Sequence, residues 1–166
     1  MQERASRVAD PYRDTAVIDE RAPRFNQAVV GALAAVAVST DAWWLLALLA
    51  GQLLLGLTLG RRWCLACVVY FELLQPLLGE GRLEDARPPR FANIVGTVFL
   101  AASAAAYGAD VALLGAVLGG IVAALALLAA ASGLCAGCEA FKLACLLRRR
   151  PFVSCPLPPQ PSHGQG

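Results

Sequence analysis

Four long apolar stretches divide the sequence, and short polar segments separate them. The stretches run Phe25–Thr40, Ala42–Gly60, Phe91–Ala109 and Val111–Leu134. Their apolar residues are continuous, whereas the strands of a membrane barrel would alternate them with a polar lumen face. A bilayer core about 30 Å thick is crossed by about 20 apolar residues in a helix. The last three stretches approach that length, and the first has 16 residues. The pattern therefore predicts an all-α membrane protein with four transmembrane helices.

The distribution of charge predicts how these helices are oriented. The short links inside the two pairs of stretches carry only Asp41 and Asp110 as charged residues, and all 14 lysines and arginines lie elsewhere. They occupy the N-terminal segment, the middle connection and the C-terminal end. Because basic residues concentrate on the cytoplasmic side of short loops, we expect both termini in the cytoplasm. The protein is then a multi-pass protein of the bacterial inner membrane. Aspartate and glycine also suit tight turns at the two links.

Composition supports the membrane interpretation and excludes several functions. Hydrophobic residues make up 58% of the chain, against about 45–50% in a typical soluble domain. A helical hairpin buried in a soluble bundle is the alternative. The four stretches contain no Lys, Arg, His, Asp or Glu, which argues against a proton pump or an ion-coupled transporter. We expect no nucleic-acid partner, because the net charge is only +2. No phosphate-binding loop, histidine cluster or Ser/His/Asp arrangement is present.

The two halves of the chain open with the same pattern, D-x-R-x-P-R-F, at Asp19–Phe25 and Asp85–Phe91. In each half, two apolar stretches and a Cys-x-x-Cys follow. An even number of spans gives both halves the same orientation, so we predict two tandem hairpins forming a parallel repeat. The expected organisation is a charged cytoplasmic tail (1–18), a four-helix domain (19–150, with repeats 19–78 and 85–147) and a disordered proline-rich tail (151–166).

Two smaller features accompany this organisation. The apolar run Trp63–Phe71 is too short to cross the bilayer and return. We expect it to extend the second helix or lie in the interface, and we expect Pro76 and Gly79 to end it. The glycine pairs Gly56/Gly60 and Gly115/Gly119 have the small-x-x-x-small spacing that lets helices approach closely in lipid. Packing within the chain is the expected use of these pairs, and a homodimer face is the alternative.

The cysteines are the only candidate reactive groups. The six are Cys64, Cys67, Cys135, Cys138, Cys145 and Cys155. Three interpretations stay open. Cysteine packs well as a small apolar residue, so the thiols could be inert. Cytoplasmic disulfides tend to be transient and catalytic, so the thiols could instead form a redox or sulfur relay. Finally, the four thiolates of Cys64, Cys67, Cys135 and Cys138 could close a zinc site; we expect no other cofactor. Basic residues beside each pair would lower the pKa of a thiol.

The sequence around the second pair gives it a distinct context. Glycines flank Cys135 and could bend the helix end there, which favours Cys135 and Cys138 as the functional, catalytic pair. Three segments together resemble a bacterial integral-membrane family of unknown function, domain of unknown function 4395. They are D-E-R-A-P-R-F-N-Q at 19–27, R-P-P-R-F at 87–91 and G-L-C-A-G-C-E at 133–139. The resemblance covers about residues 17–147. It implies a small four-helix membrane protein ending in a Cys-x-Gly-Cys segment, with no established activity.

The resemblance adds two expectations about chemistry. The first pair, Cys64 and Cys67, is not part of the family pattern, which disfavours the four-thiolate zinc site. Proteins of this kind lie beside thioredoxin-like and sulfurtransferase proteins. We therefore expect a membrane-anchored thiol pair that passes electrons or sulfur to such a cytoplasmic partner, rather than a classical enzyme. The alternative function is a non-catalytic membrane scaffold or small-solute carrier whose cysteines serve only in packing.

Overall fold

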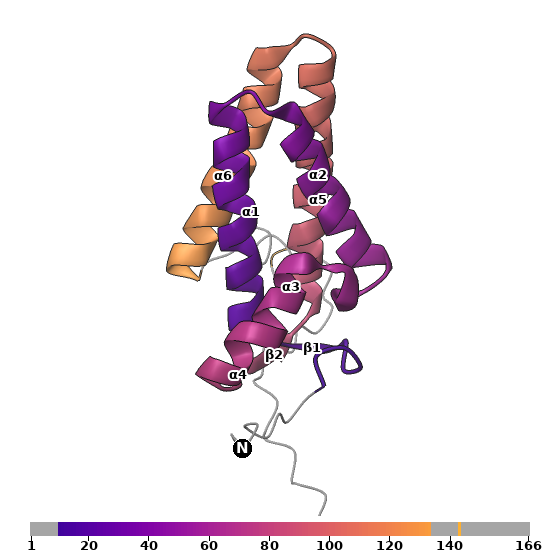
Figure 1. Cartoon of the computed structure of the whole chain (residues 1–166), viewed down its shortest axis with the longest axis vertical. Coiled ribbons are helices and arrows are strands. Elements are labelled where there is room, and N and C mark those ends of the chain that lie inside the picture. Colours follow the sequence, from indigo (N-terminus) through magenta and orange to yellow (C-terminus); the bar gives the residue numbers. More distant parts are fainter. Residues whose placement is uncertain (1–9, 134–142, 144–166) are drawn as a thin grey trace, which may run out of the picture.

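The structure is a computed structural model that describes residues 10–133 and 143. It is mostly helical, and four long helices form an elongated bundle (Figure 1). The long helices are α1 (Arg21–Ser39), α2 (Trp43–Thr58), α5 (Arg87–Gly108) and α6 (Ala112–Ser132). Each corresponds to one of the four predicted apolar stretches, so their helical assignment is confirmed. Two of them, α5 and α6, are long and apolar enough to cross a membrane by length and composition.

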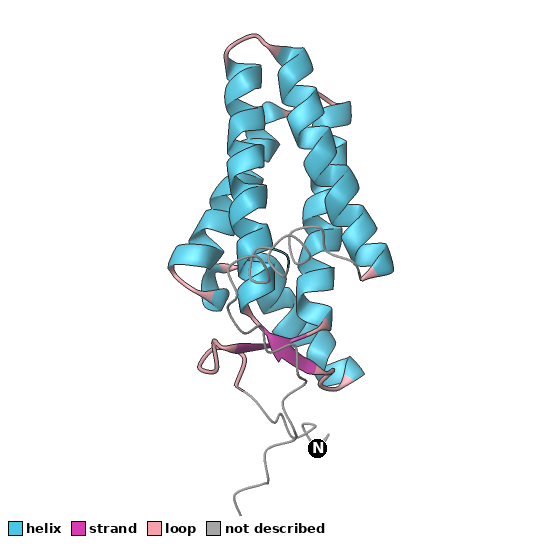
Figure 2. Ribbon diagram, turned by 180° about the vertical axis from the view of Figure 1, so that it is seen from behind, coloured by secondary structure: helices cyan, strands magenta, loops and turns pink. Residues whose placement is uncertain are grey.

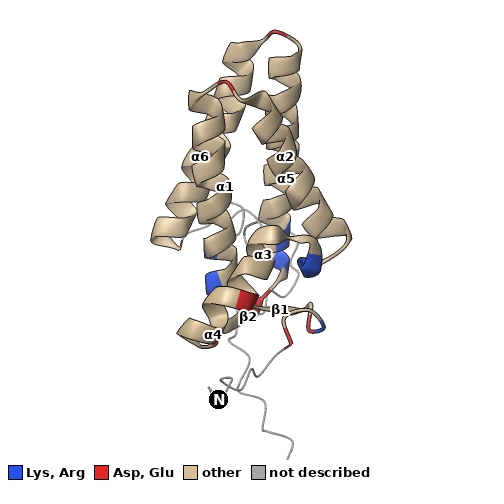
Figure 3. Cartoon of the chain, viewed as in Figure 1, with Lys and Arg blue, Asp and Glu red and all other residues tan. Residues whose placement is uncertain are grey.

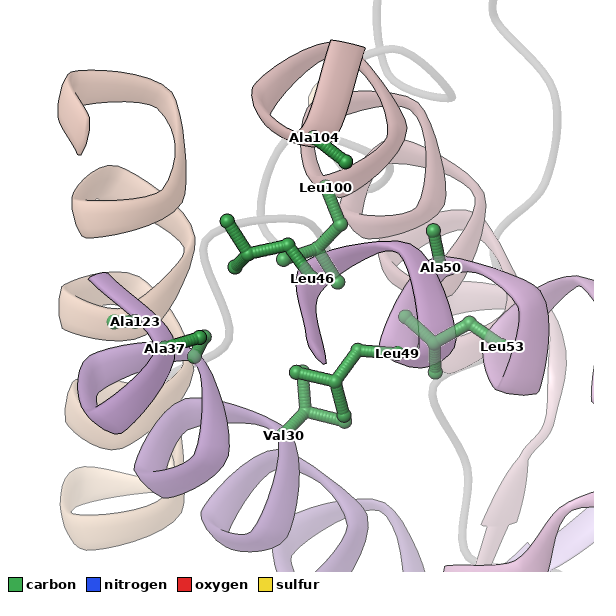
Figure 4. Close-up of a cluster of buried hydrophobic side chains, with 10 residues drawn as sticks. Val30, Ala37, Leu46, Leu49, Ala50, Leu53, Leu100, Ala104 and Ala123 are labelled. Carbon is green, nitrogen blue, oxygen red and sulfur yellow. The ribbon is translucent and has the colours of Figure 1, made fainter. Parts of the chain in front are cut away.

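The helices pack in a closed ring around one apolar core. α1 packs mainly against α6, α2 against α5, and α5 against α6. Small and branched side chains meet between them (Figure 4). Leu46 and Leu100 are fully buried at the centre, and Ala34 and Ala37 let α1 come close. The ring leaves Val98, Leu113 and Leu128 exposed on the outside of α5 and α6.

Glycines set the closest helix contacts. A Cβ at Gly115 would lie 2.5 Å from the Tyr107 ring, and one at Gly119 would lie 2.7 Å from Val38 Cγ2. Ser103 donates a buried hydrogen bond to the Gly115 carbonyl at 2.6 Å. The expected packing of the Gly115/Gly119 pair within the chain is confirmed. Gly60 does not pack in this way. It has φ +94 just before the 3₁₀ turn that follows α2, and a Cβ there would meet no described atom within 4 Å.

Aspartate turns join the helices of each hairpin. Asp41 and Asp110 have φ values of 52 and 61, in the left-handed region that aspartate tolerates better than most residues. The amide of Ala42 bonds the Ala37 carbonyl, and that of Val111 bonds the Ala106 carbonyl, both at 2.9 Å. The predicted tight turns are confirmed. Figure 3 shows acidic residues at these two turns, which lie at one end of the bundle, and basic residues toward the other end.

A short ribbon and a broken helix cover the basic end. β1 (Val17–Asp19) pairs antiparallel with β2 (Leu83–Asp85) (Figure 2). The connection after α2 forms a 3₁₀ turn η1 (Arg61–Trp63), then α3 (Leu65–Val69), the π-helical turn η2 (Tyr70–Leu74) and α4 (Gln75–Leu78). This apolar segment is therefore a separate short helix and does not extend α2.

The end of this short helix was predicted only in part. Gly79 ends it with φ +75, as expected, but the prediction for Pro76 is wrong. Pro76 lies inside the helix, at the start of α4. The wide turn η2 precedes it and the Gln75 amide still bonds the Tyr70 carbonyl. Pro76 thus sits where a new helical register begins, and its missing N–H costs little there.

Candidate thiol site

Cys64 and Cys67 lie where the connection after α2 turns into the short helix. Cys64 is the N-cap of α3, with the extended angles φ −89 and ψ 103. The Cys67 amide donates to Cys64 Sγ at 3.4 Å, so the sulfur occupies the position that a serine or aspartate oxygen takes at a helix N-cap. Backbone N–H groups at a helix start favour the thiolate. The local sequence therefore places Cys64 as the sulfur that ionises more readily.

Both thiols are buried in a small cluster beneath the basic end. Cys64 is 4% exposed and Cys67 is 9% exposed, and both are free. Tyr70, Phe71 and Phe25 pack in the same cluster. Gly56 of α2 allows this, since a Cβ there would lie 3.0 Å from Cys64 Cβ. The site is thus held tightly between α1, α2 and α3.

Two amide side chains approach the Cys64 sulfur inside the bundle. The Cys64 thiol donates to Asn26 Oδ1 at 3.8 Å, and Asn26 itself is 4% exposed. Gln52 of α2 also lies close enough to the sulfur to favour its thiolate. Among the described residues, Gln52 Nε2 is buried with no hydrogen-bond partner. A buried N–H without a partner is costly, and a thiolate at Cys64 would give this group an acceptor.

These contacts separate the acidities of the two thiols. The pKa of Cys64 is lowered to about 7, chiefly because the Cys67 thiol donates to it, while burial acts in the opposite direction. The pKa of Cys67 is raised, first by that same hydrogen bond and then by burial. The Arg61 charge opposes this rise. Cys64 is therefore the thiol of the pair that ionises more readily, and Cys67 is the thiol that keeps its proton.

Arg61 also fastens the N-terminal segment over the site. Its guanidinium donates to the carbonyls of Pro11 at 2.9 Å, Thr15 at 3.1 Å and Asp14 at 3.3 Å. Next to it, Arg62 lies 5.3 Å from the centre of the Tyr12 ring. The residues before β1 are thereby packed against the connection that carries the thiols.

The candidate residues of the sequence analysis divide into two groups. Cys64 and Cys67 lie in the site just described. Cys135 and Cys138, as well as Cys145, Cys155 and the proline-rich segment, lie outside the described residues, so their predicted role stays a prediction. The same holds for the four-thiolate zinc site, which needs both pairs; within residues 10–133 and 143 no three His, Cys, Asp or Glu side chains gather for a metal.

The sequence analysis missed the amides. Asn26 was visible only within the resemblance motif, and its approach to Cys64 joins residues that are 38 positions apart. Gln52 carried a weak signal as a polar residue in the middle of an apolar stretch. The basic residues Arg61 and Arg62 are the local feature of the sequence that points to a reactive first pair.

Comparison with known proteins places the chain in a family. Searches of the curated proteins and of the solved structures found no match. The family model described as a domain of unknown function (DUF4395) matches residues 18–145, which include all of the ribbon except Val17, all four long helices and both Cys-x-x-Cys pairs. The chain belongs to this family.

Proposed function

We propose that this protein is a four-span membrane protein that carries a buried thiol–disulfide pair, Cys64 and Cys67, near its cytoplasmic face. The observation that carries the proposal is the position of Cys64. Its sulfur accepts a hydrogen bond from the Cys67 amide at a helix start and lies beside two amide side chains, the buried Asn26 and the half-buried Gln52. A thiol used only for packing would need none of these polar contacts.

The surface of the bundle supports the membrane part of the proposal. Only 22% of the residues in the most apolar windows of α5 and α6 are buried in the chain. A core helix of a soluble protein would be mostly buried, whereas a helix in lipid turns apolar residues outward. Leu48 and Leu54 of α2 are 61% and 51% exposed. The separation of basic and acidic ends in Figure 3 supports cytoplasmic termini by the same charge rule as before.

The register of the ribbon supports the parallel repeat. Ile18 pairs with Glu84, and these residues each precede the first aspartate of the two D-x-R-x-P-R-F openings. On either side, Val17 pairs with Asp85 and Asp19 with Leu83. This is the pairing that a two-fold axis through the Ile18–Glu84 pair would produce. An axis along the membrane normal would relate the two hairpins in the same way.

The orientation has a direct test. In a variant whose native cysteines are all serine, Asp41→Cys or Asp110→Cys would place one thiol in an outward turn. A membrane-impermeant maleimide should label either variant in intact cells, because both turns would face away from the cytoplasm. Labelling only after the cells are broken would show that both turns face the cytoplasm, opposite to the proposed orientation. Recovery of the protein in the soluble fraction would contradict the proposed membrane location.

The chemistry follows from the two acidities. The Cys64 thiolate attacks the disulfide of a partner, forming a mixed disulfide and releasing one partner thiolate. Cys67 then loses its proton and attacks the Cys64 sulfur, which forms the Cys64–Cys67 disulfide and releases the second partner thiolate. Exchange of this kind favours an attacking thiol whose pKa is near the ambient pH. A cytoplasmic thioredoxin-like or sulfurtransferase protein is the proposed partner, and Cys135 with Cys138 is a second candidate pair for the same exchange.

The exchange can be tested on the described pair alone. The full chain is prepared in detergent with Cys135, Cys138, Cys145 and Cys155 replaced by serine, reduced, and mixed with 4,4′-dithiodipyridine. This small uncharged disulfide can reach buried thiols. We expect two thiopyridones per chain and an internal Cys64–Cys67 disulfide, seen by mass spectrometry without added pyridyl groups. Adding Cys67→Ala should leave Cys64 trapped as the mixed disulfide. Thiols that react only after unfolding would favour the scaffold or carrier with packing cysteines.

A further inference from the structure

An apolar cavity lies inside the bundle next to the thiol site. Its volume is about 140 Å³, and α1, α2, α5 and α6 all contribute to its wall. Among the residues that the structure describes, Asn26, Gln27 and Asn93 are the polar ones that line the cavity, and the other lining residues are apolar. A cavity of about 150 Å³ with apolar walls holds one benzene molecule. The space therefore suits a single six-membered ring.

The polar part of the cavity wall adjoins the thiols. Asn26 lines the cavity and also accepts the hydrogen bond of the Cys64 thiol. Its amide nitrogen donates to Asn93 Oδ1 at 3.4 Å. This use of Asn93 Oδ1 leaves the Asn93 amide hydrogens to serve a carbonyl placed in the cavity. Only the Asn26 side chain would thus separate a ring with a carbonyl group from the Cys64 sulfur.

The cavity is not sealed on its lipid-facing side. It is partly open, and its wall includes Val95 and Ile121, which are 38% and 41% exposed, and Leu125, which is 45% exposed. These residues belong to α5 and α6, the two helices that are apolar enough to span a membrane. A ligand with a hydrocarbon tail could keep its ring in the cavity and its tail among the lipids.

We infer that the cavity binds the ring of a lipid-soluble quinone, which accepts the electrons of the Cys64–Cys67 dithiol. The inference rests on the proposed thiol exchange, running in the direction in which a partner dithiol reduces the Cys64–Cys67 disulfide, and it names the acceptor that oxidises the pair again. In the reaction the two sulfurs form one S–S bond and lose two electrons and two protons. The quinone gains the same two electrons and two protons and becomes a hydroquinone. Burial of both thiols then has a purpose, since the acceptor arrives through the membrane. A lipid acyl chain would leave the amides unused.

Reduction of a quinone by the purified protein tests the inference. The full chain with only Cys64 and Cys67 retained is reduced, freed of reductant, and mixed in detergent with decylubiquinone. Its ring has no unsubstituted carbon to which a thiol could add, so the sulfurs are not arylated. We expect one hydroquinone and one Cys64–Cys67 disulfide per chain. Gly96→Leu should fill the cavity, because Gly96 lines it and a Cβ there would have, among the described residues, only Leu53 Cδ1 within 4 Å, at 3.6 Å. Quinone reduction should slow by about tenfold or more, while the reaction with 4,4′-dithiodipyridine is unchanged.

Two further variants keep the result unambiguous. Ala126→Leu fills the cavity from α6 and should slow quinone reduction as Gly96→Leu does. The test therefore remains possible if one of the two variants folds poorly. Gly51→Leu adds the same side chain where no atom lies within 4 Å, and it should reduce the quinone at the rate of the parent chain.

Each outcome separates the inference from the proposed function. If the pair reacts with 4,4′-dithiodipyridine but never reduces the quinone, the inference fails and the thiol function stands. If all three leucine variants reduce the quinone alike, the reaction does not use the cavity and the inference fails. Co-purified phospholipid found by native mass spectrometry in the parent chain, and lost from Gly96→Leu, would assign the cavity to an acyl chain. If neither oxidant forms the disulfide, both proposals fail.

Discussion

The contact between α6 and the rest of the bundle should tolerate alanine at Gly120 and not at Gly119. These neighbouring glycines lie on the same helix and differ in their surroundings. A Cβ at Gly119 would lie 2.7 Å from Val38 Cγ2 and 3.0 Å from Ser103 Oγ, whereas a Cβ at Gly120 would have no atom within 4 Å. Val38 cannot easily yield, because a β-branched residue in a helix has one strongly preferred rotamer.

The expected magnitudes follow from this geometry. Overpacking a filled contact costs about 1–3 kcal/mol, and displacing the buried bond from Ser103 to the Gly115 carbonyl adds about 1 kcal/mol. Replacing glycine by alanine inside a helix returns about 0.5–1 kcal/mol. Gly119→Ala should therefore destabilise the fold by about 1–3 kcal/mol. Gly120→Ala should be neutral or stabilising by up to about 1 kcal/mol.

The pair can be compared by reversible unfolding in detergent micelles with increasing SDS, followed by far-UV circular dichroism. Every systematic error of the membrane-like solvent affects both variants equally. Stabilities that agree within about 0.5 kcal/mol, the usual range of a neutral substitution, would refute the close approach of α6 to α1 and α5 at Gly119.

Three further predictions concern the site and the turns. Cys67→Ala removes the main hydrogen bond that lowers the pKa of Cys64 to about 7; the pH midpoint of iodoacetamide alkylation at Cys64 should rise toward the ordinary thiol value, and an unchanged midpoint would contradict the assignment. Asp110→Gly should stabilise the fold by about 0.5–1 kcal/mol and Asp110→Val should destabilise it by about 1 kcal/mol or more, because φ is 61 there; the same SDS titration measures both, and equal effects would count against the left-handed turn. Arg61→Gln loses the bonds to three carbonyls of the N-terminal segment, so amide hydrogen exchange in Val17–Asp19 should quicken by about tenfold; exchange at the parent rate would show that Arg61 does not hold this segment.

The sequence predicted the long helices and their turns because those depend on local properties. Continuous apolar residues over the length of a helix, broken by one aspartate, leave few other structures for the chain. The helices α1, α2, α5 and α6 and the left-handed Asp41 and Asp110 follow directly. Gly79 as a helix end is equally local, since a residue at φ +75 is best glycine.

The features that the sequence did not predict depend on contacts between distant segments. Pro76 reads as a helix end unless the preceding π-helical turn is known, and nothing in the composition of Tyr70–Leu74 indicates one. The thiol site needs Asn26 from α1, Gln52 from α2 and Cys64 from the connection to meet in one place. Glycines beside Cys135 drew attention to the second pair, whereas Gly56, whose missing side chain makes room for Cys64, lies eight positions before the first.

The ribbon at the basic end has a consequence for how such a chain could have arisen. Ile18 and Glu84 occupy the same position relative to the two D-x-R-x-P-R-F segments, and they pair with each other. The pairing of β1 with β2 is therefore the pairing that two identical strands would make. Closed symmetric association of two identical chains creates this kind of self-complementary contact. Fusion of two copies of a half-length chain that paired through its first strand would produce this register. A chain ending near Leu78 should still retain the capacity to find a second copy of itself.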